Sequence, residues 1–138
     1  IDISQDALEI AHENAKRNSV EVEWTQADIL SPITNYRFPI LDIIVSNPPY
    51  ICHREKANME ARVLDYEPHS ALFVPDDEPL LFYRRIATMK VAKSLYFEIN
   101  EAYGKEVCDM LKELGYTDIQ LKHDIYGKPR MVFGRIEA

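Results

Sequence analysis

Four consecutive residues, Asn47-Pro48-Pro49-Tyr50, are the groups in this chain whose types and spacing best suit a chemical reaction. The asparagine carboxamide offers a donor and an acceptor in one plane, so it can pair with a flat amide or amine and fix its orientation. Pro48 has no N–H and a locked φ, which leaves its carbonyl free to point outward. With the Tyr50 ring as a flat wall, the tetrapeptide has the groups to hold a planar –NH2 group while its nitrogen is alkylated.

The position of the tetrapeptide in the sequence supports this interpretation. It follows an apolar run, 41–45, whose length and branching predict a buried parallel strand. Open α/β sheets place their chemistry just beyond the carboxyl ends of strands. Asn-Pro and Pro-Pro are also ordinary turn sequences, so the tetrapeptide alone leaves open a simple loop after a strand.

Two aspartates fall at the ends of other predicted strands. Asp2 ends a short segment, Ile1-Asp2-Ile3, and Asp28 follows an alternating segment, 20–26. A carboxylate after the second strand of a Rossmann-like unit accepts from ribose hydroxyls, and one a strand later can accept from an adenine amino group, with Ile29 beside the ring. We therefore expect Asp2, Asp28 and Asn47 to form a row along one sheet edge. The alternative is that each aspartate is an ordinary turn or cap residue.

Helices and strands alternate along most of the chain. Helices are predicted from the N-cap Ser4 to about Asn18, over 80–89, and over 103–114 before Gly115. Strands are predicted near 20–26, 41–46, 95–100, 117–123 and 130–136. This order predicts an α/β fold with a doubly wound, largely parallel sheet whose last strand runs antiparallel. The long segment 51–79 is expected to be irregular.

Composition sets limits on the class of protein. The 138 residues fit one domain, and a net charge of −7 argues against a surface that neutralises phosphates. No apolar stretch approaches the about 20 residues of a membrane span, and no signal peptide opens the sequence, so we expect a cytoplasmic location. Cys52 and Cys108 are expected to be free thiols, and the scattered histidines predict no metal site.

The segment Asp-Ile-Ile-Val-Ser-Asn-Pro-Pro-Tyr, 42–50, resembles the signature of amino-methyltransferases that use S-adenosylmethionine. The whole chain is similar to the HemK/PrmC family of protein-(glutamine-N5) methyltransferases, which modify the glutamine of the Gly-Gly-Gln loop in peptide-chain release factors. The resemblance covers essentially all 138 residues. It includes Asp2-Ile3-Ser4, Ala7-Leu8, Asn14-Ala15, Asn47 to Tyr50, Tyr66-Glu67-Pro68, Ala71-Leu72, Phe97-Glu98-Ile99 and Gly134-Arg135.

The resemblance implies a Rossmann-like, seven-stranded methyltransferase fold, S-adenosylmethionine as cofactor, and release factors as protein partners, with no direct nucleic acid, membrane or metal. Its cofactor positions match Asp2, Ile29 and Asn47, and strand-end geometry adds Asp28. The substrate glutamine is implied to bind Asn47, Pro48, Pro49 and Tyr50, of which Asn47, Pro48 and Tyr50 are the catalytic residues. Glu67 and Glu98 are candidates for a supporting role, or are ordinary carboxylates.

The sequence departs from the family at two places. It matches the carboxyl-terminal part of the catalytic domain, and the first strand, the Gly-rich motif and the upstream helical domain have no counterpart in residues 1–138. We therefore expect a catalytic domain truncated at its N-terminus, which by itself binds S-adenosylmethionine weakly or not at all. The junction 89–94 also has no Gly-Gly turn, so either residues are missing there or the turn is tight.

Two other functions stay open. Asn-Pro-Pro-Tyr serves flat exocyclic amines equally well, so the substrate could be adenine or cytosine in a nucleic acid. Such an enzyme needs a flipped base and a basic channel. The net charge of −7 and the segment Tyr66-Glu67-Pro68 argue against this function in this chain. The other alternative is a truncated piece with no activity of its own.

Overall fold

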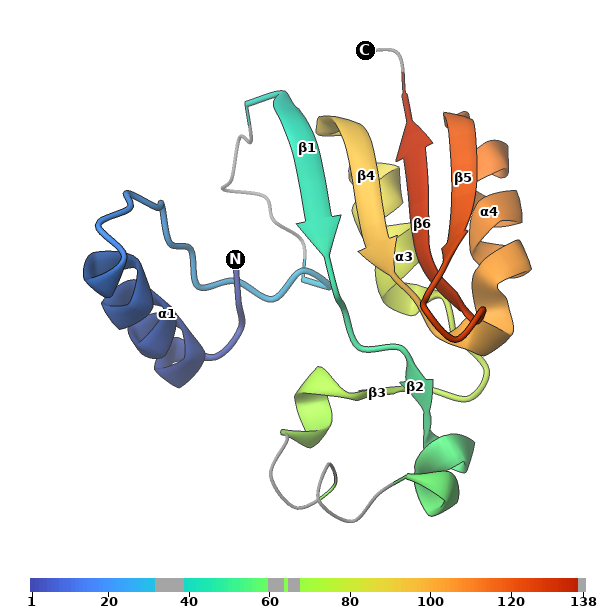
Figure 1. The fold of residues 1–138 in the computed structure, drawn as a ribbon, viewed down its shortest axis with the longest axis horizontal. Coiled ribbons are helices and arrows are strands. Elements are labelled where there is room, and N and C mark those ends of the chain that lie inside the picture. The colour runs from blue at the N-terminus through green and yellow to red at the C-terminus, as the bar shows by residue number, and fades with distance from the viewer. Residues whose placement is uncertain (32–38, 60–63, 65–67, 137–138) are drawn as a thin grey trace. The chain divides into compact units, whose positions relative to one another are not determined.

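A computed structural model of the chain describes residues 1–31, 39–59, 64 and 68–136 (Figure 1). The chain forms two compact units, Ile1–Arg37 and Phe38–Ala138.

The first unit is built on helix α1, Gln5–Arg17. The helix begins where the sequence predicts, because the Ser4 hydroxyl accepts a hydrogen bond from the Ala7 N–H at 3.2 Å and satisfies one of the free donors of the first turn. It ends at Asn18, whose side chain donates to the Asn14 carbonyl at 2.8 Å. The predicted helix and both of its ends are therefore confirmed.

The predicted strand over 20–26 is wrong. Gln26 makes an isolated parallel bridge with Asp2, through bonds from the Asp2 N–H to Thr25 and from the Ala27 N–H to Asp2 of 3.1 and 3.0 Å. Val20 and Val22, which share one face of the alternating segment, are 55 and 49 % exposed. Alternation is a local pattern, whereas a strand needs a neighbour that continues the hydrogen-bond ladder.

The second unit contains a four-stranded sheet in the order β1-β4-β6-β5 (Figure 1). Its strands are β1 (Leu41–Ser46), β4 (Ala92–Glu98), β5 (Thr117–His123) and β6 (Pro129–Arg135). β1 and β4 are parallel, and β6 is antiparallel to both β4 and β5, which confirms the antiparallel last strand. The sheet is mixed rather than largely parallel, because the final hairpin inserts β6 between β4 and β5.

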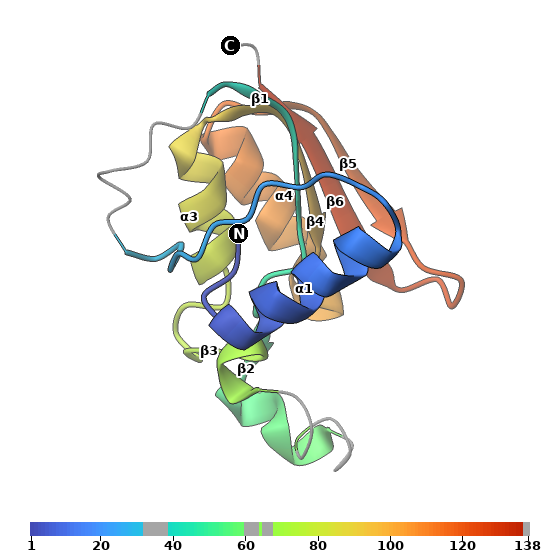
Figure 2. The same cartoon turned by 90° about the vertical axis from the view of Figure 1, so that its left-hand side faces the viewer.

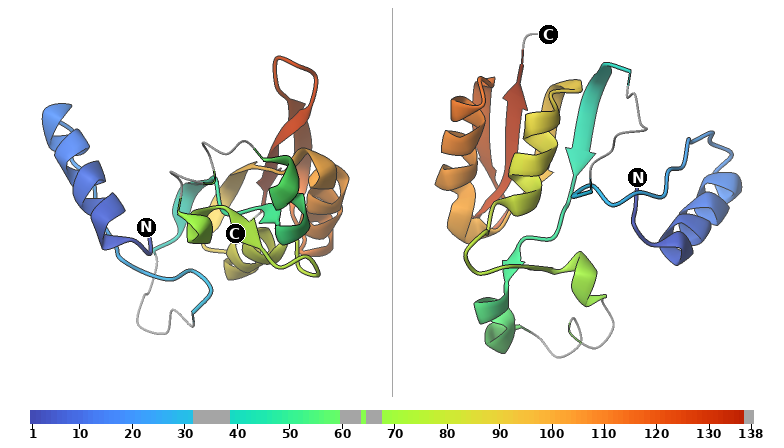
Figure 3. Two further views of the ribbon diagram at one scale, coloured as in Figure 1. Left: turned by 90° about the horizontal axis from the view of Figure 1, so that it is seen from below. Right: turned by 180° about the vertical axis from the view of Figure 1, so that it is seen from behind.

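Helices α3 (Leu81–Met89) and α4 (Gly104–Glu113) both cover one face of this sheet (Figures 2 and 3). Both helices were predicted from the sequence. The side chains that fill the layer between them and the sheet are fully or almost fully buried: Tyr83, Ile86, Ala87, Leu95, Phe97, Val107, Met110, Leu111 and Val132. In the same layer, the Tyr116 hydroxyl donates a buried hydrogen bond to the Ala87 carbonyl of α3 at 2.9 Å. On the other face of the sheet, Ile43, Val45 and Tyr96 are exposed. The prediction of a buried strand over 41–45 is therefore wrong, because β1 lies at the edge of the sheet and none of its residues is fully buried.

The junction between α3 and β4 is a tight turn. Lys90 caps the helix in the left-handed conformation, with φ 50°, and its N–H donates to the Ala87 carbonyl at 3.3 Å. This is the conformation that a glycine adopts without a steric cost, and a residue with a Cβ pays roughly 1–2 kcal/mol for it. A lysine therefore makes the turn that a Gly-Gly pair was expected to make.

The segment between β1 and α3 contains more regular structure than the sequence predicts. Strand β2 (Ile51–Cys52) pairs in parallel with β3 (Phe73–Val74), and two 3-10 helices flank them, η1 (His53–Asn58) and η2 (His69–Ala71). These pieces are each too short for sequence periodicity to reveal. Glu67, a candidate supporting residue, lies outside the described residues.

We predict that Phe97→Ala lowers the free energy of unfolding by about 3–5 kcal/mol, the cost of removing a large buried ring. Phe97 is 1 % exposed and meets the Tyr83 ring edge-on, with 5.3 Å between the ring centroids. Urea denaturation followed by circular dichroism measures the change. Ile125→Ala is the control, since Ile125 is 92 % exposed, and its midpoint should match the wild type. Equal midpoints for all three proteins would contradict the described core.

Candidate active site

The tetrapeptide 47–50 leaves the sheet at the carboxyl end of β1, as the sequence predicts. The last residue of β1, Ser46, is in register with Phe97 of the parallel strand β4. The next residues along the chain are Asn47, which follows β1, and Glu98, which is the last residue of β4, so the two strands end at the same edge of the sheet. The tetrapeptide therefore has the residues that follow β4 as its neighbours.

The two groups expected to accept from a substrate amide are available for that role. Asn47 is exposed, Pro48 is buried and Pro49 is half-buried. Within the part of the chain that the structure describes, neither the Asn47 carboxamide nor the Pro48 carbonyl makes a hydrogen bond. Both oxygens thus keep their lone pairs for a bound donor.

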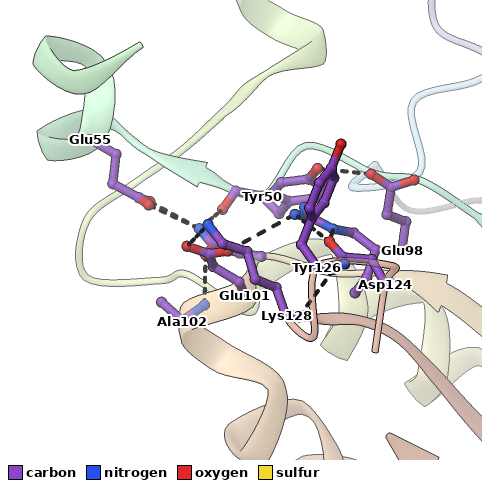
Figure 4. Close-up of polar contacts among 10 residues, drawn as sticks. Tyr50, Glu55, Glu98, Glu101, Ala102, Asp124, Tyr126 and Lys128 are labelled. Atoms are coloured by element: carbon purple, nitrogen blue, oxygen red, sulfur yellow. Dashed lines mark hydrogen bonds and ion pairs between the residues drawn. The ribbon is translucent and has the colours of Figure 1, made fainter. Parts of the chain in front are cut away.

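Tyr50, the last residue of the tetrapeptide, is held at both ends (Figure 4). Its hydroxyl donates to Glu98 Oε1 at 3.0 Å, and its backbone carbonyl accepts from Asn100 Nδ2 at 3.2 Å. The backbone of Glu98 is held in turn, because the Tyr83 hydroxyl donates to the Glu98 carbonyl at 3.2 Å. Glu98 therefore fixes the orientation of the Tyr50 ring.

The surroundings of Tyr50 raise the pKa of its hydroxyl. Burial is the largest cause, because it disfavours the phenolate, and the hydrogen bond to the Glu98 carboxylate adds to it. Arg130 acts in the opposite direction and does not cancel the rise. Tyr50 is consequently a neutral hydrogen-bond donor throughout the physiological pH range.

A group of paired charges lies at the same edge, on the loop after β4 and on the β5–β6 hairpin (Figure 4). Arg130 Nε donates to Asp124 Oδ2 at 3.3 Å, and Lys128 Nζ lies 2.8 Å from Glu101 Oε2. Asp124 also accepts from the backbone N–H groups of Tyr126 and Lys128, which lowers the pKa of its carboxyl group. These contacts hold the hairpin turn in one conformation next to Tyr50.

Sequence reasoning missed Asn100 and Arg130. Asn100 lies two residues after the end of β4 and directly follows the apolar Ile99, and a polar residue at the end of an apolar segment is the signal that selected Asp2, Asp28 and Asn47. The same signal could have selected Asn100. Arg130 had no such signal, because its role depends on a hairpin that brings it back to Tyr50.

The predicted cofactor aspartates both lie in the first unit. The Asp2 carboxylate accepts from the Ser4 N–H at 2.9 Å, and the Asp28 carboxylate accepts from the Leu30 N–H and the Ser31 hydroxyl, both at 2.9 Å. These are the bonds of ordinary turns, and Asp28 does not follow a strand. Because Asn47 belongs to the other unit, its expected row with Asp2 and Asp28 stays a prediction, and so does the role of Ile29.

Cys52 is buried and Cys108 is half-buried, and both are free thiols. Among residues 1–31, 39–59, 64 and 68–136, no three His, Cys, Asp or Glu side chains gather in a way that could hold a metal ion. No helix in the same ranges is long and apolar enough to cross a membrane.

Comparison with known proteins defines the class. Residues 1–66 match the family described as the methyltransferase small domain. A release factor glutamine methyltransferase from Bacteroides thetaiotaomicron is 45 % identical over 136 residues, which are 95 % of this chain and 49 % of that protein. Those from Flavobacterium psychrophilum and Lactococcus lactis are 45 and 39 % identical over 138 residues, covering 96 and 95 % of this chain and 47 and 49 % of theirs.

Residues 1–66 thus match a family of methyltransferases. Over almost all of its length the chain is similar to the release factor glutamine methyltransferases, which confirms the resemblance inferred from its motifs. The chain spans about half the length of the curated relatives it matches.

We predict that Glu98→Gln lowers the pKa of Tyr50 without returning it to the ordinary value for tyrosine. The carboxylate contributes to the rise, but burial is its larger cause and is unchanged by the substitution. Spectrophotometric titration of the phenolate, taken as the difference between each protein and its Tyr50→Phe counterpart, isolates this group. Glu113→Gln, at an exposed residue of α4, is the control and should leave the pKa unchanged. An unchanged or raised pKa in Glu98→Gln would show that the Tyr50–Glu98 bond is not formed.

Proposed function

We propose that the protein transfers a methyl group from S-adenosylmethionine to the side-chain amide nitrogen of the glutamine in the Gly-Gly-Gln loop of peptide-chain release factors. The observation that carries this proposal is a pair of acceptors without hydrogen bonds among the described residues, Asn47 Oδ1 and the Pro48 carbonyl, next to the fixed ring of Tyr50. The names of the three relatives support the same substrate.

The two acceptors address the weakness of an amide as a nucleophile, since its lone pair is delocalised into the carbonyl. The Asn47 oxygen and the Pro48 carbonyl accept one N–H each, which orients the nitrogen and stabilises the positive charge that develops on it. Orientation in a closed site contributes up to about 7–11 kcal/mol in well-ordered reactions. No strong base is needed, because the alkylated nitrogen becomes acidic and loses its proton to water.

We propose that the cofactor is held by Asp2, Asp28, Ile29 and Asn47. Asp2 and Asp28 lie on neighbouring stretches, joined by the Asp2–Gln26 bridge, and a carboxylate has about four lone-pair sites, more than their turn hydrogen bonds use. These free acceptor sites fit the hydroxyl and amino groups of adenosine, which donate hydrogen bonds. When bound, S-adenosylmethionine supplies a methyl group activated by a sulfonium.

We infer that residues 1–138 are part of a catalytic domain with a seven-stranded, Rossmann-like methyltransferase sheet. The parallel β1–β4 pair and the antiparallel last strand β6 support it, and so does the share of the relatives that the chain spans. A cytoplasmic location is part of the proposal, because release factors act there.

A nucleic-acid amine is the less favoured substrate. The net charge of −7 opposes a phosphate-binding surface, and at the candidate edge the cations Lys128 and Arg130 are already paired with Glu101 and Asp124. A neutral amide side chain can bind without a phosphate-binding surface. The methyl acceptor proposed here is therefore a protein amide.

We predict that Asn47→Ala lowers release-factor methylation by two orders of magnitude or more, about 2.7–4 kcal/mol, as for the loss of one preorganised polar group. Asn47→Asp should also fail, because it keeps an acceptor but adds a charge and loses the amide donor. The measurement is mass spectrometry of a release factor incubated with each variant of the full-length protein and S-adenosylmethionine.

Two comparisons make this experiment decisive. Gln120→Ala, at an exposed position of β5, is the matched control and should methylate as the wild type does. Thermal melting should be unchanged in all variants, since Asn47 is exposed and makes no hydrogen bond within the described residues. Near-normal methylation by Asn47→Ala would mean that the tetrapeptide is only a turn.

A further inference from the structure

A buried carboxamide lies directly behind the tetrapeptide. Asn100 follows β4 and is 6 % exposed. Its Oδ1 accepts from the Ala102 N–H at 2.9 Å, and its Nδ2 donates to the Tyr50 carbonyl at 3.2 Å. The same nitrogen lies 3.1 and 3.0 Å from Glu55 Oε1 and Oε2 (Figure 4).

The partners of Asn100 permit one orientation of its side chain. The Ala102 N–H can only donate, whereas the Tyr50 carbonyl and the Glu55 carboxylate oxygens accept. The carboxamide meets both requirements, with one amide hydrogen for each accepting group. An aspartate or an apolar side chain of similar size has no hydrogen to offer to Tyr50 or Glu55.

Glu55 extends the contact to the next part of the loop. Its Oε2 accepts from the Cys52 N–H at 2.8 Å. Asn100 thus holds the Tyr50 carbonyl directly. It holds the Cys52 N–H indirectly, because Glu55 contacts both Asn100 and Cys52. Pro48 and Pro49 have no N–H, so the preceding part of the loop cannot be held by donors of its own backbone.

We propose that Asn100 is a positioning residue, which with Glu55 fixes the direction in which the loop 47–50 leaves β1. Its effect on methylation rests on the proposed function. Asn100 acts through Tyr50 and the main chain, and it does not contact the transferred group. The aim of the Asn47 and Pro48 oxygens at a substrate amide depends on the Asn100–Glu55 pair.

The test uses Asn100→Asp, Glu55→Gln and the double variant in the full-length protein. Asn100→Asp sets a second carboxylate against Glu55 and leaves the Tyr50 carbonyl without its donor, so we expect turnover to fall roughly tenfold or more at saturating substrate, as for a misplaced catalytic group. In the double variant, the carboxamide introduced at position 55 donates to the carboxylate introduced at position 100 and still accepts from the Cys52 N–H, so turnover should recover in part. Ser94→Ala, at a buried polar residue of β4, is the matched control and should keep normal turnover.

Hydrogen exchange of the segment 47–56, followed by mass spectrometry, gives a readout that does not depend on methylation. We expect faster exchange in Asn100→Asp, partial recovery in the double variant and no change in Ser94→Ala. Unchanged exchange in Asn100→Asp overturns the proposal. Faster exchange with normal turnover also overturns it, since the loop would then be free to move without loss of function.

The same experiments remain informative if the wild type shows no methylation or if a variant does not fold. If the wild type methylates no release factor, the proposed function fails, and the exchange pattern still decides whether Asn100 holds the loop. If Asn100→Asp does not fold, Glu55→Ala takes its place, because it removes the bond to the Cys52 N–H and spares Asn100. Faster exchange and lower turnover are then expected, and no change in either overturns the proposal.

Discussion

The parallel pairing of β1 with β4 is the constraint on which the candidate active site depends. Parallel strands end at the same edge of a sheet, and the register of Ser46 with Phe97 brings the residues that follow the two strands together. β1 is followed by the tetrapeptide, and β4 is followed by the polar residues that hold it. A shift of one residue in this register would turn Glu98 to the opposite face and remove it from Tyr50.

Local signals in the sequence were enough to predict the helices. Ser4 and Asn18 set the ends of α1, and Gly115, with φ +88°, follows the end of α4, because caps depend on neighbours within one turn. The strand over 20–26 failed for the opposite reason, since its alternation says nothing about whether a neighbouring strand is present. The mixed sheet was missed because the place of β6 between β4 and β5 is a matter of tertiary pairing.

In the candidate site, too, local features could be predicted from the sequence and long-range contacts could not. The tetrapeptide could be found because its residues are consecutive and follow a strand. Glu98 was recognised as a candidate, but its partner was not, since the contact with Tyr50 joins residues 48 positions apart. The pair Asn100 and Glu55 depends on a contact between residues 45 positions apart, which no periodicity or spacing in the sequence records.

The burial of Cys52 gives this loop a natural chemical reporter. Its side chain is 0 % exposed, and it comes two residues after Tyr50, within the segment that Glu55 holds. A thiol-specific reagent can reach this sulfur only when the segment leaves its place. Alkylation of Cys52, distinguished from Cys108 by peptide mapping, therefore counts the opening events of the loop, so its motion can be followed without a foreign label.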